Sequence, residues 1–379
     1  MNFWVTLSLE FKRMNHSLEG CGHELIMKVK NSIKYIVSLA LAALLLWASF
    51  RDVEWADFIN GIKNCRWEFI ILSMAAGAFA FWLRALRWRR LLLPIDDSIT
   101  RTTTFNGINI GNISNFVFPR IGEFVRCGVI TRHSAYVTPS SDSAHSSALS
   151  EELSSSTDLK GLQKKATYDK VLGTVVLERG WELLVMLLLL AVVLVGGFDR
   201  FGTFFIDQIW TPISSSLNFS MWWIVAAIFV ISGLMIYFVW RFRTTNAFCS
   251  KVAGIARGLL QGFSSCLKME MKWLFFAYTA LIWITYWFMA SCTMWAAPFL
   301  EELDMIDALF LSLVGGLGFA VPVPGGIGAF HFIIGLALSV IYGLPMELGI
   351  IYATLSHTSQ AITQILFGLG SYAYEAICK

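Results

Sequence analysis

Nine long apolar segments follow one another along this chain, and they constrain its fold more than any other feature. Several reach the roughly 20 residues that a helix needs to cross the hydrocarbon core of a bilayer. Charged residues make up only 15% of the chain, whereas a soluble domain has roughly 25%. The strands of a membrane barrel would instead alternate in blocks of about ten residues. The sequence therefore predicts an all-α, polytopic helical membrane protein with apolar segments at 33–50, 67–88, 105–119, 171–197, 221–240, 273–298, 305–321, 327–342 and 346–372.

Basic residues flank these segments unevenly, which predicts their orientation in the membrane. They cluster before the first segment, at the end of the second and between 240 and 273, whereas acidic residues follow position 298. We therefore expect the N-terminus, the C-terminus and a serine-rich loop to be cytoplasmic. The net charge of +3 is spread along the chain, so it gives no argument for nucleic acid as a partner.

The chain is predicted to hold a single transmembrane domain with two polar additions. Residues 1–27 read as an N-terminal extension, because they lack the apolar core and cleavage site of a signal peptide. Residues 28–372 form the transmembrane domain, whose halves run from 33 to 197 and from 221 to 372. The serine-dense insertion at 133–165 is too polar to bury a core, so we expect a disordered cytoplasmic loop.

The two halves share one order of elements: span, span, a short broken hairpin, and span. The first hairpin runs over 105–119 and 121–131, and the second over 305–321 and 327–342. An odd number of crossings in the first half makes the second copy enter from the other side, which predicts an inverted repeat. Irregular backbone at membrane depth needs protein or water around it, so two opposed re-entrant hairpins indicate a central cavity. The second hairpin could instead be two short full crossings.

Charged residues beside the first break are the strongest candidates for a binding site. Arg120, Glu123 and Arg126 follow Pro119 on one helical face and leave net positive charge, which suits a phosphate group. An internal network of ion pairs is the alternative. Four asparagines at every third position, including Asn112 and Asn115, form either a hydrogen-bonding wall for a headgroup or contacts between helices; the other two are Asn106 and Asn109.

A second charged group lies about two turns into the segment that begins near 171. Glu178 and Glu182 share one face, so Arg179 cannot neutralise both, and Arg120 or Arg126 is the expected partner. Either a structural salt bridge or a proton-coupling carboxylate would explain this group. The second span ends in Trp82, Arg84, Arg87, Trp88 and Arg90, which read as interfacial anchors that also attract lipid phosphate.

A turn rich in glycine and proline, residues 322–328, breaks the second hairpin. Gly325 and Gly326 lie where free N–H groups at a helix start could hold an anion, but the turn lacks the lysine of a nucleotide-binding loop. His331 and His357 are either ligands or hydrogen-bonded packing residues. The seven cysteines are scattered, so we expect neither a metal nor another cofactor.

Four motifs occur in an order that resembles the lysylphosphatidylglycerol synthase transmembrane-region family, whose members are flippase-like integral membrane proteins. They are Leu83-Arg84-x-x-Arg87-Trp88, Asn115-x-x-x-Pro119-Arg120-x-Gly122-Glu123-x-x-Arg126, Leu172-Gly173-x-x-x-x-Glu178-Arg179 and Pro322-x-Pro324-Gly325-Gly326-x-Gly328. The resemblance implies an inner-membrane protein with about eight spans and re-entrant elements. His331 stands where many relatives carry glutamate, and the insertion at 133–165 is longer than usual.

We therefore expect a lipid translocase rather than an enzyme. Its partner would be a membrane lipid with an anionic headgroup, either a phospholipid or a polyprenyl-phosphate-linked lipid, held by Arg120, Glu123, Arg126 and Arg179. The resemblance does not carry over a synthase activity, because we expect no aminoacyl-transfer domain here. The alternatives are a membrane-embedded glycosyl- or phosphoryl-transfer enzyme, for which Asp96-Asp97 is the only pair of adjacent aspartates in a cytoplasmic loop, and a scaffold for a glycosyltransferase or lipid-modifying partner.

Overall fold

The computed structural model describes residues 36–51, 53–137, 163–202, 206–207, 211–212, 221–242, 249–250 and 271–377. Within these ranges almost every regular element is a helix, which confirms the all-α prediction. The exception is a two-residue antiparallel ladder between β1 (Tyr136–Val137) and β2 (Gln163–Lys164). The N-terminal extension predicted at 1–27 and most of the insertion predicted at 133–165 lie outside the described residues.

The helices of the described residues follow the predicted apolar segments closely. In chain order they are Ile36–Phe50, α2 (Trp55–Lys63), α3 (Trp67–Leu92), α4 (Arg101–Val117), α5 (Gly122–His133), α7 (Tyr168–Gly196), α10 (Met221–Phe242), α12 (Lys272–Ala296), α13 (Met305–Gly318), α14 (Ala329–Tyr342) and α15 (Met346–Ile377). Short turns of other helix types are η2 (Phe198–Gly202), η4 (Pro298–Leu300) and η5 (Pro324–Gly326).

Four helices of the described residues are long and apolar enough to cross a membrane: α3, α7, α12 and the segment Pro324–Tyr342. The helix Ile36–Phe50 and α2, bent by 87°, would make a fifth if they cross together. The segment Pro324–Tyr342 reaches this length only because it joins η5 to α14 across a kink at Gly325. These helices fit a multi-pass membrane protein, and the expected total of about eight spans stays a prediction.

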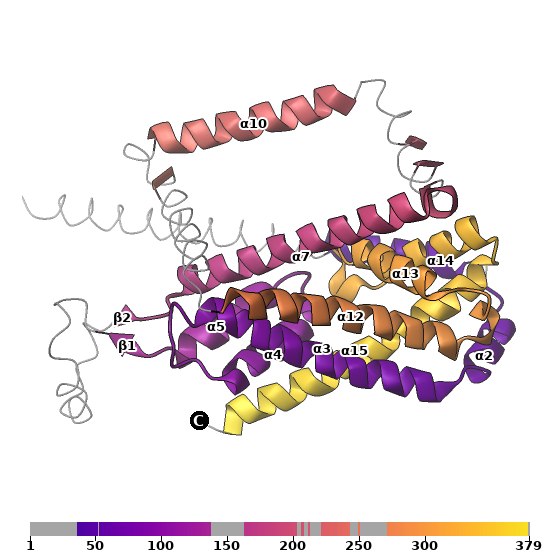
Figure 1. The fold of residues 1–379 in the computed structure, drawn as a ribbon, viewed down its shortest axis with the longest axis horizontal. Coiled ribbons are helices and arrows are strands. Elements are labelled where there is room, and N and C mark those ends of the chain that lie inside the picture. Colours follow the sequence, from indigo (N-terminus) through magenta and orange to yellow (C-terminus); the bar gives the residue numbers. More distant parts are fainter. Residues whose placement is uncertain are drawn as a thin grey trace, which may run out of the picture.

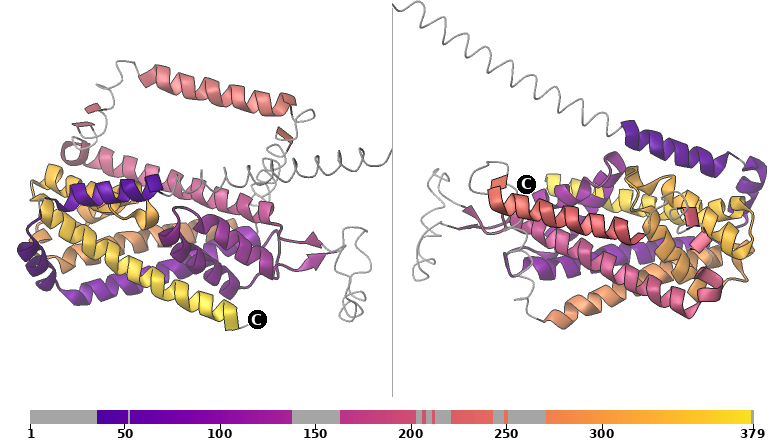
Figure 2. Two further views of the ribbon diagram at one scale, coloured as in Figure 1. Left: turned by 180° about the vertical axis from the view of Figure 1, so that it is seen from behind. Right: turned by 90° about the horizontal axis from the view of Figure 1, so that it is seen from above.

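The long helices form an elongated bundle in which α3 and α12 run antiparallel (Figure 1). The Arg66 N–H donates to the Ala296 carbonyl at 2.8 Å, and the Ser73 hydroxyl donates to the Met289 carbonyl at 3.2 Å. Helix α15 runs obliquely along the bundle, whereas α10 lies outside α7, apart from the other helices (Figure 2).

Two helical hairpins lie inside this bundle, at the two breaks that the sequence predicts. Helices α4 and α5 pack on each other and join at 118–121, and α13 and α14 do the same across 319–328. At about 1.5 Å per residue, the 14-residue helices α13 and α14 are about 21 Å long, shorter than the roughly 30 Å hydrocarbon core. Their re-entrant and inverted arrangement in a membrane remains a prediction.

The tips of the two hairpins meet. The Arg120 guanidinium, in the first break, donates to the Ala320 carbonyl in the second. Gly325 lies directly against the Phe116 ring, so that a Cβ there would be 2.7 Å from that ring. The helix Ile36–Phe50 covers the second break from outside, where the Ser38 hydroxyl donates to the Pro322 carbonyl at 2.6 Å. The two irregular segments therefore form one contact region, at which Arg120 and Ala320 are exposed.

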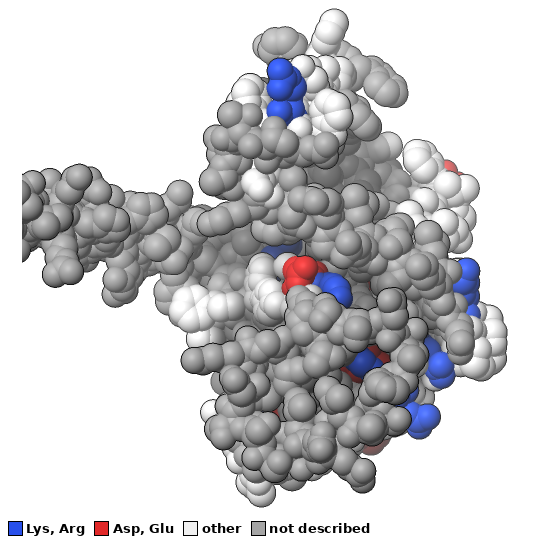
Figure 3. Space-filling model, turned by 90° about the vertical axis from the view of Figure 1, so that its left-hand side faces the viewer, with Lys and Arg blue, Asp and Glu red and all other residues white. Residues whose placement is uncertain are grey.

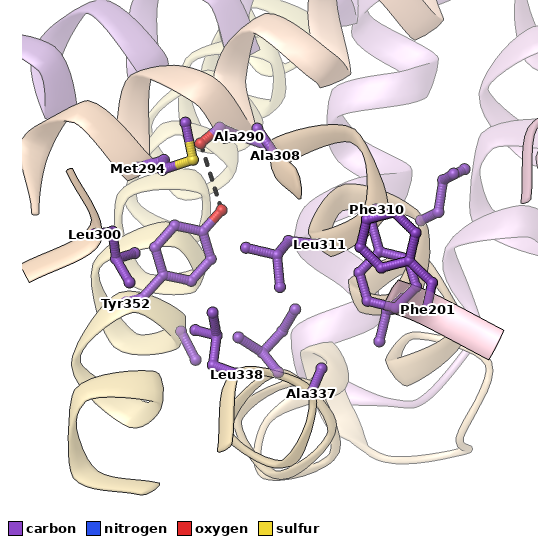
Figure 4. Packing of buried hydrophobic residues seen from close by; sticks show 14 of the residues in the cluster. Phe201, Ala290, Met294, Leu300, Ala308, Phe310, Leu311, Ala337, Leu338 and Tyr352 are labelled. Atoms are coloured by element: carbon purple, nitrogen blue, oxygen red, sulfur yellow. Dashed lines mark hydrogen bonds between the residues drawn. The ribbon is translucent and has the colours of Figure 1, made fainter. Parts of the chain in front are cut away.

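Apolar side chains fill the bundle on both sides of this region. One cluster joins α7, α12, α13, α14 and α15, and there the rings of Phe201 and Phe310 stack at 4.4 Å between centroids (Figure 4). In the same cluster the Tyr352 hydroxyl donates to the Ala290 carbonyl at 3.3 Å, so the polar tip of this buried ring is satisfied. A second cluster surrounds Trp88 near the ends of α3 and α7.

The two ends of the bundle differ in charge. At the end where α3 stops and α4 and α12 begin, here named the basic end, described Lys and Arg side chains lie at the surface (Figure 3). The basic residues there are Arg89, Arg90, Arg101, Arg132, Lys165, Lys170 and Lys272, against Asp96, Asp97, Asp169 and Glu375. The opposite, acidic end carries Glu54, Asp57, Glu68, Asp199, Glu301, Glu302, Asp304, Asp307 and Glu347, against Arg51, Lys63, Arg66 and Arg200.

Asp96 holds the base of the insertion to the loop between α3 and α4. It is 1% exposed and accepts hydrogen bonds from the Ser98 and Ser134 hydroxyls, each at 2.6 Å, and from the Ser98 and Ala135 N–H groups. Burial alone would raise the pKa of Asp96, but these bonds, led by that from Ser134, lower the pKa below its ordinary value of 3.8.

Asp96→Asn should therefore loosen this end of the bundle, because a neutral amide accepts weaker hydrogen bonds than a carboxylate. The loss is expected at about 1–2 kcal/mol of local stability, measured by hydrogen exchange at the Ser98 and Ala135 amides. Since the folded pKa is depressed, the carboxylate stabilises the fold above its unfolded pKa, and this contribution is lost as pH falls through the folded pKa. Exposed Asp97→Asn is the control and should leave exchange at these amides unchanged.

Candidate functional site

Six charged side chains from α3, α5 and α7 form one continuous ionic network. Glu178 lies at its centre, with one oxygen 3.1 Å from Arg87 and the other 2.7 Å from Arg126. Arg126 also pairs with Glu123 at 2.6 Å. Arg179 closes the ring through Glu123 at 3.0 Å and Glu182 at 2.6 Å, and Glu182 pairs with Arg87. Three guanidiniums and three carboxylates thus balance one another.

The centre of the network is buried, and its rim is partly exposed. The side chains of Arg87 and Glu178 are 0% exposed and that of Arg126 is 3% exposed, whereas Glu123 is 25% and Arg179 38% exposed. Charges buried this deeply are stable only when they are paired, and here each has its partners. Arg126 is therefore the partner of Glu178 that the sequence required, and Arg87 is a second partner that the sequence analysis did not identify.

Trp88 packs against the Arg126 guanidinium of this network and does not lie at the membrane interface as an anchor. It is 0% exposed, its indole N–H donates to the Thr174 hydroxyl at 3.0 Å, and the Arg126 guanidinium lies 4.5 Å above its ring. The interpretation of Trp88 and Arg87 as interfacial anchors is therefore wrong, because tertiary packing encloses both. Trp82 is 38% exposed, as an anchor would be.

A cavity of about 690 Å³ lies beside the network, between the two hairpins and helices α3, α7, α12 and α15. This volume falls in the roughly 300–1,000 Å³ range of small-molecule sites. Its charged lining consists of Arg84, Arg120 and Arg179 with one carboxylate, Glu123. A smaller crevice of about 10 Å³ connects it to Arg126 through shared lining residues, which are Arg84, Asn112, Asn115, Glu123 and Arg179.

Arg84 and Arg120 give the cavity its excess positive charge. In the part of the chain that the structure describes, neither has a carboxylate within 4.0 Å, and the Arg84 Nε atom is buried without a hydrogen-bond acceptor. Arg120 is also held at a φ of 60°, in the left-handed region that side chains other than glycine rarely adopt. Such strain concentrates at functional sites, where the surrounding structure enforces it.

The four asparagines of α4 divide between the two roles left open by their spacing. Asn106 donates to Glu375 on α15 at 2.9 Å, and the Asn115 carbonyl oxygen accepts from the Gly122 N–H at 2.8 Å, so both hold helices together. Asn112 and Asn115 also line the cavity, and the Asn112 amide nitrogen has no partner there. Asn109 is buried, and neither end of its amide has a partner among the described residues.

The turn at η5 forms the floor of the cavity next to the second break. Gly325 and Gly326 have φ values of 59° and 77°, and both line the cavity. His357 joins this turn to α15, because its Nε2 lies 2.9 Å from the Gly325 carbonyl and its ring stacks with Phe319. His331 lies 5.2 Å from His357 between ring centroids but outside the lining.

The remaining polar lining is neutral and comes mainly from α12 and α15. It includes Trp283, Tyr286, Gln360 and Gln364. Among the described residues, His, Cys, Asp and Glu side chains form no group of three that could hold a metal ion. The site can thus bind an anion and hydrogen-bond a neutral polar group.

Sequence comparison places this chain in a known family. The family model described as lysylphosphatidylglycerol synthase TM region matches residues 35–157 and 159–368. The chain belongs to this family. No curated protein and no solved structure matches it. The match confirms the resemblance drawn from the four motifs, spans every lining residue of the cavity, and indicates a membrane protein of lipid synthesis or translocation.

Proposed function

We propose that this protein is a lipid translocase that moves an anionic phospholipid or polyprenyl-phosphate-linked lipid across the inner membrane. The observation that carries the proposal is the cavity between the hairpin tips, in which Arg84 and Arg120 lack a carboxylate partner among the described residues. A guanidinium binds phosphate through two parallel hydrogen bonds, so these residues suit a lipid phosphate. The acyl or polyprenyl chains would stay in the bilayer.

Within this proposal, the charged residues have separate roles. Arg84, Arg120 and Arg179 face the headgroup, and Asn112 and Asn115 border it. Arg87, Arg126 and Glu178 do not line the cavity but fix Glu123 and Arg179, which do. Gly325, Gly326 and His357 shape the floor. His331 packs against the His357 ring from outside the cavity lining.

Arg120 also joins the two hairpin tips, which gives a physical link between binding and movement. Its guanidinium donates to the Ala320 carbonyl, an acceptor in the opposite break. A phosphate would compete for the same N–H groups and would weaken this contact. The proposal therefore includes opposed, re-entrant hairpins whose tips separate when a headgroup binds.

The charge difference between the bundle ends supports the predicted orientation. Basic residues prevail where α3 ends and α4 begins, and acidic residues prevail at the other end. Cytoplasmic segments carry the excess of Lys and Arg in membrane proteins. We therefore propose that the basic end, which includes the C-terminal end of α15, faces the cytoplasm.

Arg120→Ala and Arg84→Ala should each slow lipid movement by roughly 10–100-fold in proteoliposomes. Each loses a charge-assisted hydrogen bond to phosphate, at about 1.5–3 kcal/mol, and about 1.4 kcal/mol corresponds to tenfold. Lysine at either position should restore part of the rate, because it keeps the charge but not the planar fork. Movement is measured as the fraction of anionic lipid that becomes accessible from outside.

Arg101→Ala is the matched control, since Arg101 lies on the same hairpin but outside the cavity lining. It should move lipid at the unmodified rate. Unchanged movement in both cavity variants would overturn the proposal. Hydrolysis or transfer products in the same vesicles would favour an enzyme, although the acidic doublet lies outside the cavity: Asp96 is held by hydrogen bonds and Asp97 pairs with Lys165.

A further inference from the structure

We propose that the cavity selects lipids whose phosphate carries a neutral, hydroxylated group and excludes headgroups that carry an ammonium group. This inference rests on the proposed translocase function and specifies the substrate class of the same site. It implies that this chain does not move lysylphosphatidylglycerol, the aminoacylated lipid in the name of its family. The shared chemistry is a phosphodiester joined to a polyol or a sugar.

The first argument is the charge of the lining. Glu123 is the only carboxylate among the described lining residues, and it is already engaged. One of its oxygens lies 3.0 Å from Arg179 and the other 2.6 Å from Arg126. An ammonium group entering the cavity would find no free carboxylate and would lie near Arg84 and Arg120. Like charges in such a confined space repel strongly.

The second argument is the neutral part of the lining, opposite the arginines on α3 and α7. The Trp283 indole N–H is buried without an acceptor among the described residues, whereas the Gln360 amide packs on α3, where its nitrogen donates to the Ser73 hydroxyl at 3.2 Å and its oxygen lies against Gly77. Both residues line the cavity. A buried donor without an acceptor, on a residue that lines the cavity, is matched by a hydroxyl group, which can accept its hydrogen bond.

The third argument is the shape of this part of the cavity. The rings of Trp283 and Tyr286 lie 5.8 Å apart between centroids at 81°, so they present a ring face and a ring edge side by side. Gln364 lies one helical turn beyond Gln360 on α15, and both border the cavity. Aromatic faces beside amide groups suit the mixed apolar and hydroxylated surface of a polyol or a sugar.

The experiment compares four lipids in proteoliposomes of the full chain: phosphatidylglycerol, a polyprenyl-phosphate hexose, phosphatidic acid and lysylphosphatidylglycerol. Diol oxidation by impermeant periodate reports the first two, and an impermeant amine reagent reports the lysyl lipid. We expect the diol lipids to move at least tenfold faster than the lysyl lipid. Whether the glycerol or the hexose lipid is faster identifies the source of the headgroup.

Two substitutions separate recognition from folding. Trp283→Phe keeps the ring but removes the N–H, and it should slow the diol lipids several-fold while leaving phosphatidic acid unchanged. Gln364→Glu adds a carboxylate to the cavity and should speed the lysyl lipid. Equal slowing of phosphatidic acid in Trp283→Phe would overturn the recognition role of this residue.

The outcomes distinguish this inference from the proposed function. A lysyl lipid that moves as fast as the diol lipids would overturn the selectivity but leave the translocase function standing. If no lipid moves in any vesicle, the proposed function itself fails. A faster lysyl lipid in Gln364→Glu alone would support both.

Discussion

Replacing Glu178 by alanine is expected to destabilise the protein by about 3–5 kcal/mol, the cost of breaking a buried ion pair by removing one partner. Glu178 is 0% exposed and is shared by Arg87 and Arg126, which are themselves enclosed. Without it, Arg126 keeps Glu123 as its one partner among the described carboxylates, and two guanidiniums face each other across the vacated position. The effect is large because neither arginine can reach water to regain its hydration.

Thermal unfolding of the protein in detergent measures this loss of stability. The readout is the fraction of protein that stays monodisperse after heating. The double variant Arg126→Leu/Glu178→Leu should recover much of the stability, because it removes one charge of each sign and fills the space with apolar volume. Arg66→Ala is the control: it breaks an ion pair at the surface, with side chains 45% and 61% exposed, and should cost less than about 1 kcal/mol. Equal losses for Glu178→Ala and Arg66→Ala would contradict the proposed importance of burial.

The buried network has no net charge, yet it positions two of the charged residues that line the basic cavity. Arg87, Arg126 and Glu178 hold the two residues, Glu123 and Arg179, that reach the cavity from inside. The excess positive charge comes from Arg84 and Arg120, which lie outside the network. Structural pairing and headgroup binding are thus divided between neighbouring residues, although the sequence presents them as one cluster.

Local spacing predicted the parts of this site that lie on one helix. The positions of Glu123 and Arg126, and of Arg179 and Glu182, at i and i+3 correspond to ion pairs in the structure. The two hairpin breaks were also predicted, because proline and clustered glycines interrupt an apolar helix. These features depend on residues close in the chain, so their sequence signal is strong.

Apart from the pairing of Arg126 with Glu178, contacts between distant segments were not predicted, because no periodic pattern encodes them. The pairing of Arg87 with Glu178 joins positions 91 residues apart, and the contact from Arg120 to Ala320 joins positions 200 apart. An arginine at the end of an apolar span normally extends to the membrane interface, so the sequence wrongly predicted Arg87 to be an interfacial anchor. Burial by α7 and α12 overrides that tendency.

Gly122→Ala is expected to open the first hairpin and to cost about 3 kcal/mol, at the upper end of the range for overpacking. A Cβ at this position would lie 2.0 Å from the Gly111 carbonyl oxygen and 2.8 Å from the Asn115 side-chain oxygen. The first atom belongs to the backbone of α4 and cannot rotate away, so α5 would have to move. That movement would also break the hydrogen bond from the Gly122 N–H to Asn115 and displace Glu123 from Arg179.

Gly128→Ala, on the same helix, is the matched control because no atom lies within 4 Å of its added Cβ. It should be neutral or slightly stabilising, by up to about 1 kcal/mol, since alanine favours a helix more than glycine does. Each variant adds one methyl group to α5. A difference between them in thermal unfolding or in lipid movement therefore reports the close approach of α4 and α5. Equal stability of both variants would show that the hairpin is not held at this contact. If Gly122→Ala is stable but slow, the contact sets the position of Glu123 and Arg179 at the cavity.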